Sequence, residues 1–132
     1  MLVGGLVNGN VFIGMQPPRA RMEDGDDSVA QPDGKAVHDP VLPATHHYLG
    51  YYRWLRDVFG AQAVIHVGTH GTLEWMPGKS VGLSERCHPD AAIRDLPNLY
   101  PYNVGIIGEG TQAKRRSYAC ILDQMIPAET HA

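Results

Sequence analysis

Short blocks of apolar residues alternate with polar and glycine-rich stretches along the first half of the chain. The segment Asn10-Val-Phe-Ile-Gly-Met15 is β-branched and aromatic, and it predicts a buried strand that ends at Pro17-Pro18. Glycines and an Asn-Gly turn precede it, so Leu2–Val7 is expected to pair with it in a hairpin. A helix is predicted to begin at the N-cap residue Thr45 and to end at Gly60. Its buried face is expected to hold Tyr48, Tyr51, Tyr52, Leu55, Val58 and Phe59.

The second half of the chain continues with short elements of both kinds. In chain order, the pattern predicts a strand over Ala61–Ile65, a helical turn over Thr72–Trp75, a short helix over Ala91–Arg94, a strand over Tyr102–Ile107 and a helix over Gln112–Met125. The core face of the last helix would hold Ala113, Tyr118, Ile121, Leu122 and Met125. Strands that alternate with helices are typical of α/β proteins. We therefore expect an α/β fold with a partial, open and mainly parallel sheet flanked by helices.

Length and composition set the scale of this fold. The 132 residues, of which 43% are hydrophobic, suit one packed domain. The predicted strands and helices make only about half of a doubly wound sheet, so residues 1–132 are interpreted as a single partial domain and a fragment of a longer protein. Between the hairpin and the first helix, a proline-broken stretch at about residues 20–44 carries several aspartates and predicts a long, exposed acidic loop.

Charge and cysteine content exclude several classes of function. The formal net charge of −3 gives no reason to expect a nucleic-acid surface. Cys87 and Cys120 form no CxxC motif, which argues against a zinc ribbon and against a disulfide framework. No apolar run reaches the roughly 18–20 residues that a membrane span needs. A soluble cytoplasmic protein is therefore expected.

The run with the most chemical content is His66-Val-Gly-Thr-His70-Gly-Thr-Leu-Glu74. It follows a predicted parallel strand at the carboxyl end, where open α/β sheets place their ligands. Two imidazoles and a carboxylate suit a divalent transition metal. The glycines between them disfavour a continuous helix, so the three groups would converge only through a turn. A polar loop whose histidines bond to the backbone explains the same spacing, and spacing alone leaves both interpretations open.

Two common motifs are excluded around this run. Glu74 does not follow the first histidine directly, so the pattern is not the HExxH helix of a zinc hydrolase. The glycine spacing before Lys79 does not match a P-loop, so this chain is not expected to bind ATP itself.

Further cationic and aromatic residues are candidates for substrate binding. The run Gly108-Glu-Gly-Thr111 precedes Lys114, Arg115 and Arg116, and it is expected to put backbone N–H groups and three cations at a helix N-terminus, where anions bind. One or two of the cations would hold substrate carboxylates, and a solvated or ion-paired surface is the alternative. His46 begins the first predicted helix beside tyrosines, which serve equally well as core or as an aromatic wall for a flat macrocycle.

Taken together, these runs resemble the large subunit shared by cobaltochelatases and magnesium chelatases. The matching segments are Asn10–Arg19, Leu42–Trp54, His66–Lys79, Pro97–Pro101 and Gly108–Arg116. They follow the family's order and cover most of this chain, but only a small central part of that long subunit. The sequence Leu73-Glu-Trp-Met-Pro-Gly-Lys79 is similar to the cobaltochelatase branch, because the magnesium branch tends to have phenylalanine after the glutamate. The stretch Met22–Val37 is longer and more acidic than in either branch, and no role is assigned to it.

The resemblance implies a ligase that inserts Co²⁺ into a corrin-type tetrapyrrole, such as hydrogenobyrinate a,c-diamide, in cobalamin biosynthesis. It also implies that separate AAA+ ATPase and adaptor subunits hydrolyse ATP, and that the isolated fragment is inactive without the rest of the large subunit. The expected catalytic and metal-binding residues are His66, His70 and Glu74, which would hold or relay the incoming metal while Glu74 also accepts a proton. The expected substrate-binding residues are His46, Lys79, Arg115 and Arg116.

Three other interpretations stay open. The first is insertion of Mg²⁺ into protoporphyrin IX, although hard Mg²⁺ prefers oxygen ligands and two histidines fit cobalt better. The second is a non-catalytic scaffold segment whose motifs serve subunit docking. The third is an unrelated metal-binding module or hydrolase.

Overall fold

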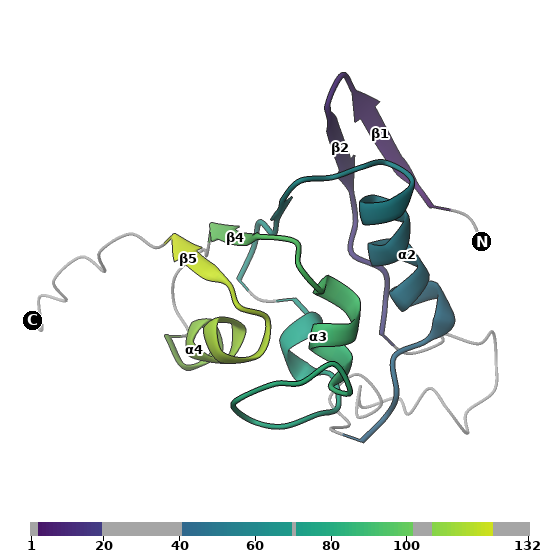
Figure 1. The fold of residues 1–132 in the computed structure, drawn as a ribbon. Coiled ribbons are helices and arrows are strands. Elements are labelled where there is room, and N and C mark those ends of the chain that lie inside the picture. Colours follow the sequence, from purple (N-terminus) through teal and green to yellow (C-terminus); the bar gives the residue numbers. More distant parts are fainter. Residues whose placement is uncertain (1–2, 20–40, 70, 102–106, 123–132) are drawn as a thin grey trace, which may run out of the picture.

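The computed structural model describes residues 3–19, 41–69, 71–101 and 107–122. In chain order, its elements are β1 (Gly5–Asn8), β2 (Val11–Gly14), α2 (His46–Asp57), β3 (Val64–Ile65), the 3-10 helix η1 (Leu73–Trp75), α3 (His88–Ile93), β4 (Asn98–Pro101), α4 (Ile107–Arg116) and β5 (Cys120–Leu122). Figure 1 shows the β1–β2 hairpin beside α2, and α3 between α2 and α4. Within the described ranges, no helix is long and apolar enough to cross a membrane. The stretch predicted as an acidic loop falls mostly on residues 20–40, outside these ranges.

Three short strands form a parallel sheet in the order β3-β4-β5. Val64 of β3 pairs with Asn98 of β4, and Tyr100 of β4 pairs with Ile121 of β5. Helices η1 and α3 lie between β3 and β4 in the chain, and α4 lies between β4 and β5, because parallel neighbours need a crossover connection. The expected α/β fold with a partial, mainly parallel sheet is confirmed.

The two N-terminal strands pair antiparallel as a hairpin, as predicted. The prediction that the second strand is buried is wrong, because Val11 and Ile13 are 56% and 60% exposed. Phe12 turns toward α2, where its ring packs edge-on against Trp54 with 5.0 Å between centroids. One helix covers one face of a two-stranded ribbon, so alternate residues of β2 stay on the surface.

Helix α2 begins at the predicted N-cap. The side chain of Thr45 accepts the backbone N–H of Tyr48 at 3.2 Å, which satisfies one of the free donors of the first turn. The helix ends at Asp57, three residues before the predicted end at Gly60. Val58 is the C-cap and is 71% exposed, so its predicted place in the core is wrong. The chain leaves the regular helical path directly after Val58, because the Phe59 N–H bonds to the Trp54 carbonyl, five residues back, at 2.9 Å.

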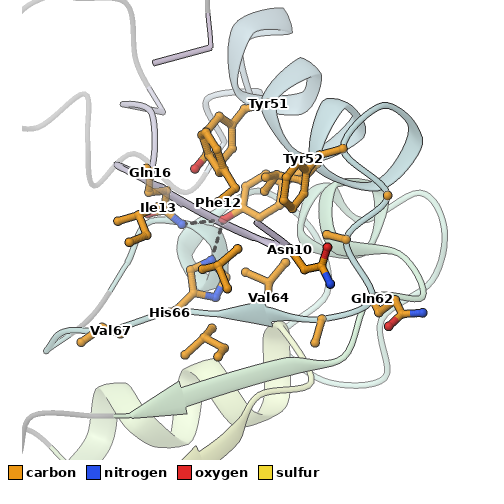
Figure 2. Close-up of a pocket in the computed structure, with 18 of the residues that line it drawn as sticks. Asn10, Phe12, Ile13, Gln16, Tyr51, Tyr52, Gln62, Val64, His66 and Val67 are labelled. Carbon is orange, nitrogen blue, oxygen red and sulfur yellow. Dashed lines mark hydrogen bonds between the residues drawn. The ribbon is translucent and has the colours of Figure 1, made fainter. Parts of the chain in front are cut away.

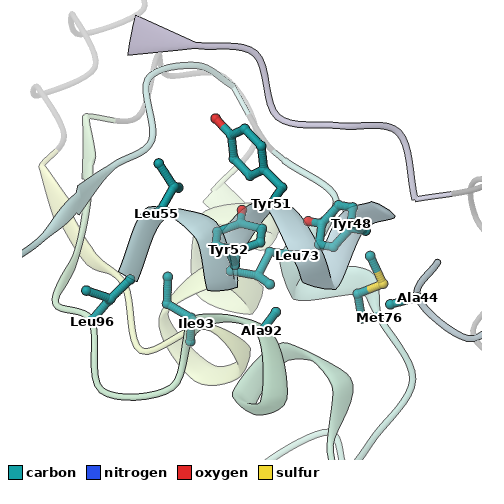
Figure 3. Close-up of a cluster of buried hydrophobic side chains, with 10 residues drawn as sticks. All are labelled: Ala44, Tyr48, Tyr51, Tyr52, Leu55, Leu73, Met76, Ala92, Ile93 and Leu96. Atoms are coloured by element: carbon teal, nitrogen blue, oxygen red, sulfur yellow. The ribbon is translucent and has the colours of Figure 1, made fainter. Parts of the chain in front are cut away.

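The main core lies where α2 meets η1 and α3 (Figure 3). Its buried members are Ala44, Tyr48, Tyr51, Tyr52, Leu55, Leu73, Met76, Ala92, Ile93 and Leu96. Three of them are tyrosines from one face of α2, and a buried tyrosine hydroxyl normally requires a polar partner. A smaller cluster of Tyr100, Ala113 and Ala119 fills the space between the sheet and α4.

The fourth strand lies earlier than the sequence pattern predicts. It was expected over Tyr102–Ile107, but the strand is β4 at Asn98–Pro101, while residues 102–106 lie outside the described ranges and Ile107 begins α4. Prolines at both ends of Pro97–Pro101 hide this strand in the pattern. Pro101 is tolerated because it is the last residue of β4, where its carbonyl still accepts a bond from the backbone N–H of Gly68 at 3.3 Å.

The predicted C-terminal helix over Gln112–Met125 is wrong in both bounds. Helix α4 begins at Ile107 and ends at Arg116, and the following apolar residues form strand β5. Tyr118 has a φ of +53°, which breaks the helical path between them. Tyr118 and Leu122 are therefore about half exposed instead of lying on a core face, whereas Ala113 is buried as predicted.

The loop between η1 and α3 folds around the buried thiol of Cys87. The sulfur accepts the backbone N–H of Lys79 at 3.4 Å and that of Ser84 at 3.5 Å. Gly78 approaches so closely, with a φ of +145°, that a Cβ added there would lie 2.7 Å from Cys87 Cβ. Only glycine meets both demands at this position.

Candidate functional site

A pocket of about 890 Å³ lies between the hairpin, α2 and the segment that leads into β3 (Figure 2). Phe12, Ile13 and Leu55 contribute apolar walls, and the side chains of Gln16 and His66 contribute polar groups. A volume of this size lies within the usual range of pockets for small molecules, about 300–1,000 Å³, and the mixture of apolar walls with a few polar groups is also typical of them.

Three polar side chains form a row along one side of this pocket (Figure 2). Gln16 Nε2 donates to Tyr52 Oη at 2.7 Å, and Tyr52 Oη lies 2.8 Å from His66 Nε2. At the outer end, Gln16 Oε1 accepts the backbone N–H of Thr72 at 2.9 Å and lies 3.1 Å from its hydroxyl. The row therefore connects the segment after β2, helix α2, the end of β3 and the start of η1.

The row continues from His66 into the sheet and α4. His66 Nδ1 lies 2.7 Å from Oδ1 of Asn98, the first residue of β4. Asn98 is buried, and its Nδ2 donates to the Ser117 carbonyl at 2.9 Å and lies 3.2 Å from the Ser117 hydroxyl. That hydroxyl donates to the Ala113 carbonyl at 2.8 Å. Both ring nitrogens of His66 thus have a protein partner.

Burial governs the acid–base properties of this row. Desolvation lowers the pKa of His66 and raises the pKa of Tyr48 and of Tyr52. The carboxylate of Glu74 raises the pKa of all three to a smaller extent through its charge. The imidazole and both phenols are therefore neutral at pH 7.

Glu74 lies in η1 and is 1% exposed. Its Oε1 accepts the backbone N–H of Gly71 at 3.0 Å, which closes the turn that carries the predicted metal-binding run. Carboxylates are rarely buried this completely unless they are paired or functional. Glu74 therefore lies inside the fold and raises the pKa of His66 through its charge.

Two of the three predicted metal-binding residues lie in the described part of the chain. His70 lies outside it, so the convergence of all three groups stays a prediction. Among the residues that the structure describes, no group of three or more His, Cys, Asp and Glu side chains is arranged to hold a metal ion. A metal that binds His66 through Nε2 would take the place of the Tyr52 hydroxyl, which occupies that nitrogen.

The four predicted substrate-binding residues lie apart from the pocket. His46, Lys79 and Arg115 are exposed. Arg116 is partly buried, and its guanidinium donates to the Met76 carbonyl at 2.6 Å, which ties α4 to the segment after η1. The prediction that these cations lie at a helix N-terminus is wrong for Lys114, Arg115 and Arg116, which form the last turn of α4, where positive charge is favourable.

Gln16, Asn98 and Arg19 carry no motif that marks them as site residues. Arg19 is 1% exposed, and its guanidinium donates to the Trp75 carbonyl at 2.9 Å and to the Leu42 carbonyl at 3.0 Å. A buried arginine that binds backbone carbonyls fastens these segments together. The sequence offers only an indirect indication of these three residues. Gln16, Arg19 and Asn98 each adjoin a proline within a segment that resembles the chelatase family.

Comparisons with known proteins cover the whole chain. The family profile described as CobN/Magnesium Chelatase matches residues 1–132. The aerobic cobaltochelatase subunit CobN of Pseudomonas aeruginosa is 50% identical over 132 residues, which are 100% of this chain and 10% of the relative. The chloroplastic magnesium-chelatase subunit ChlH of Oryza sativa subsp. indica is 40% identical over 132 residues, 100% of this chain and 9% of the relative.

A solved structure agrees with these relatives. The catalytic subunit of cobaltochelatase from Mycobacterium tuberculosis superposes with a TM-score of 0.74 at 49% identity, over 93% of this chain and 10% of that chain. The chain therefore spans about a tenth of the length of the relatives that it matches.

Proposed function

Because the chain belongs to the CobN/magnesium chelatase family, we propose that it is part of the large subunit of an ATP-dependent chelatase that inserts Co²⁺ into a corrin-type tetrapyrrole. A substrate such as hydrogenobyrinate a,c-diamide places the reaction in cobalamin biosynthesis. AAA+ ATPase and adaptor subunits hydrolyse the ATP. The observation that carries the proposal is the match of the family profile over residues 1–132.

The preference for cobalt over magnesium rests on the comparisons and on ligand chemistry. Identity to the cobaltochelatase subunit of P. aeruginosa is 50%, against 40% for the rice magnesium-chelatase subunit. Imidazole nitrogen suits Co²⁺, whereas Mg²⁺ prefers an all-oxygen shell. A histidine that lines the pocket therefore fits the cobalt reaction better.

The pocket supports a role in handling the macrocycle and the metal. Its apolar walls suit the flat faces of a tetrapyrrole, and His66 reaches the same space. In this proposal His66 and His70 receive the metal, and Glu74 binds the metal or accepts a pyrrolic proton. Metal entry exchanges the Tyr52 hydroxyl for the ion at His66 Nε2.

The substrate's carboxylates require cations. Arg115 and Lys79 are exposed and available for this purpose, and His46 is available at the start of α2. Arg116 has one amino group bound to Met76, so it contributes through its remaining N–H groups. Their distance from the pocket implies that they act on the periphery of the macrocycle or with other parts of the subunit.

The test replaces His66 with alanine in the intact large subunit, together with its partner subunits and ATP. The rate of Co²⁺ insertion is expected to fall at least about tenfold while macrocycle binding persists, because the metal loses a ligand. His47→Ala is the matched control, since His47 is an exposed histidine of α2. An unchanged insertion rate in His66→Ala would remove the metal-handling role.

A second measurement separates the chelatase interpretation from a scaffold. The 132-residue chain alone is titrated with Co²⁺, Zn²⁺ and Mg²⁺, and separately with a tetrapyrrole. We expect no insertion by this chain alone, because the partner subunits and the rest of the large subunit are absent, but we expect measurable binding of Co²⁺. A chain that binds neither metal nor tetrapyrrole would favour the scaffold role.

A further inference from the structure

The hydrogen bonds on either side of the pocket histidine have a fixed direction, because the row ends in backbone groups. At one end, the Thr72 N–H can only donate, so Gln16 Oε1 is the acceptor and Gln16 Nε2 is the amide nitrogen that faces Tyr52. The Gln16 amide therefore supplies the hydrogen of its bond to Tyr52. This leaves the hydrogen of the Tyr52 hydroxyl free for a bond to the histidine.

The other end fixes the orientation of a second amide. The Ser117 carbonyl can only accept, so the group of Asn98 that faces it at 2.9 Å is Nδ2. The Asn98 oxygen then faces His66 Nδ1 at 2.7 Å. A rotation of this amide by half a turn would set its oxygen against the Ser117 carbonyl oxygen, and that buried carbonyl would lose its donor. Each buried group left unsatisfied in this way costs about 1–3 kcal/mol.

These two orientations decide which nitrogen of His66 carries the hydrogen. Asn98 Oδ1 has no hydrogen to give, so His66 Nδ1 must be the N–H. The ring is neutral in its buried setting, so Nε2 holds a lone pair and accepts the Tyr52 hydroxyl at 2.8 Å. The donors then all point the same way, from Thr72 to Ser117.

We propose that Asn98 is a positioning residue for His66, which it holds in the Nδ1–H tautomer so that the Nε2 lone pair faces Tyr52 and the pocket. This inference rests on the proposed function, in which His66 receives the incoming metal. Metal-binding histidines generally donate their second ring N–H to a carbonyl or carboxylate, and this bond sets the tautomer and the ring orientation. Asn98 supplies such an acceptor, and Ser117 holds the Asn98 amide in place.

Asn98 is suited to this positioning role because its side chain is buried. Its side chain is 4% exposed, and both of its polar atoms are used inside the protein. Water is therefore a poor replacement for its oxygen when the side chain is changed. The position lies in the Pro97–Pro101 run, whose contribution to the site is otherwise unassigned.

The tautomer is measured directly by ¹⁵N NMR of the histidine side chains in the 132-residue chain. Metal-free buffer at about pH 8 keeps ordinary histidines neutral. Wild-type His66 is expected to be the Nδ1–H form. Asn98→Leu removes the acceptor at similar size, and we expect a shift toward the Nε2–H form. Asn98→Asp keeps an acceptor, and Ser117→Ala keeps the backbone carbonyl, so both are expected to retain Nδ1–H.

The same variants are then placed in the intact large subunit with its partners. Asn98→Leu is expected to lower the rate of Co²⁺ insertion about 10- to 100-fold, the usual effect of losing a partner of a ligating histidine, with macrocycle binding unchanged. Asn98→Asp is expected to recover part of that rate.

Two results would overturn the positioning role. One is the observation of wild-type His66 in the Nε2–H form. This measurement uses only the wild-type chain and so does not depend on whether a variant folds. The other is an Asn98→Leu chain that keeps His66 as Nδ1–H. A wild-type subunit that shows the expected tautomer but inserts no metal would overturn the proposed function instead, so the two failures are distinguishable.

Discussion

At the scale of single residues, Tyr52 connects the core to the pocket. Its ring is 1% exposed and packs on the buried face of α2, while its hydroxyl lies between Gln16 and His66. Burial raises the pKa of Tyr52, so the hydroxyl keeps its proton and can donate it to the imidazole at any moderate pH. One oxygen atom therefore provides a hydrogen-bond partner for two partly buried side chains.

Tyr52→Phe keeps the ring and removes this oxygen. The free energy of unfolding is expected to fall by about 1–3 kcal/mol, because the Gln16 amide and the His66 ring each lose a buried partner. Urea denaturation of the 132-residue chain measures the change. Tyr51→Phe is the matched control, since Tyr51 is the preceding residue of α2 and its ring is also buried. Equal losses in both variants would contradict a specific role for the Tyr52 hydroxyl.

The lowered pKa of His66 leads us to expect that the free energy of unfolding depends on pH in metal-free buffer. Its folded-state pKa lies below the unfolded value of about 6.5, because burial disfavours the imidazolium. The unfolded chain thus binds a proton that the folded chain does not, so the contribution of His66 to stability is present above about pH 6.5 and is lost as the pH drops below it. Asp57, whose pKa is lowered by Arg56, titrates below this window.

Urea denaturation midpoints between about pH 8 and pH 5 would check this dependence. His66→Gln is expected to lower stability overall and to flatten the slope in that window, because the buried titrating group is gone. A wild-type chain that becomes more stable on acidification would contradict the assignment of a buried neutral imidazole.

At the scale of elements, the loop between η1 and α3 depends on a glycine for its close approach to Cys87. Gly78 and Gly82 both have a positive φ, of +145° and +62°, so alanine strains the backbone at either position. The two glycines differ in how much room surrounds them. A Cβ added to Gly78 would lie 2.7 Å from Cys87 Cβ, whereas a Cβ added to Gly82 would have no atom within 4 Å.

Alanine substitutions at the two positions therefore distinguish the cost of backbone strain from the cost of steric overlap. Gly82→Ala is expected to lower the free energy of unfolding by about 1–2 kcal/mol from strain alone. Gly78→Ala is expected to cost about 1–3 kcal/mol more, because the buried thiol must move. Thermal unfolding of both variants, with the reactivity of Cys87 toward a thiol reagent, would test the comparison. Similar stability and similar Cys87 protection in the two variants would count against close packing at Gly78.

The elements differ in how well the sequence predicts them, for physical reasons. Helix α2 was predictable because its N-cap and its tyrosine periodicity agree. Strand β4 and helix α4 were not, because one proline precedes the strand, another is its last residue, and two glycines lie in the first turn of the helix. Tertiary contacts outweigh the local effect of these prolines and glycines. Strand β4 pairs with a strand on each side, and the face of α4 that carries Ala113 is buried.

The site was predictable in part. The sequence pointed to His66, which lines the pocket, and to Glu74, which is buried in η1. It did not identify Gln16 and Asn98, because an amide gives no sign of its partners until strands far apart in the chain come together. The sequence also provided no reason to assign different roles to Arg115 and Arg116. In the structure, the Arg116 guanidinium donates to a backbone carbonyl.

At the scale of the whole molecule, the β1–β2 hairpin lies at one end of the fold (Figure 1), and several of its apolar side chains are exposed. Leu6, Val7, Val11, Ile13 and Met15 are each more than half exposed, while Phe12 fastens the hairpin to α2. Leu6, Val11 and Ile13 lie on the face of the hairpin opposite Phe12, and an exposed apolar face of this kind binds hydrophobic probes. These side chains also contribute little to the stability of the chain, because they are not buried within it.

The double variant Val11→Thr with Ile13→Thr keeps the β-branched shape and removes apolar surface. Binding of a fluorescent hydrophobic dye to the 132-residue chain is expected to decrease, while the urea midpoint changes by the equivalent of less than about 0.5 kcal/mol. Val81→Thr, at an exposed position of another loop, serves as the control. A large loss of stability, or dye binding equal to that of the wild type, would contradict an exposed hairpin face.

The row of hydrogen bonds from Thr72 to Ser117 also has a kinetic consequence. A proton wire works only if each of its links can swap donor and acceptor after every passage. This row begins at an N–H and ends at a C=O, and neither of these groups can exchange roles. It is therefore a one-way brace and not a proton wire, so under the proposed function a proton taken from the macrocycle would have to leave the site by another route.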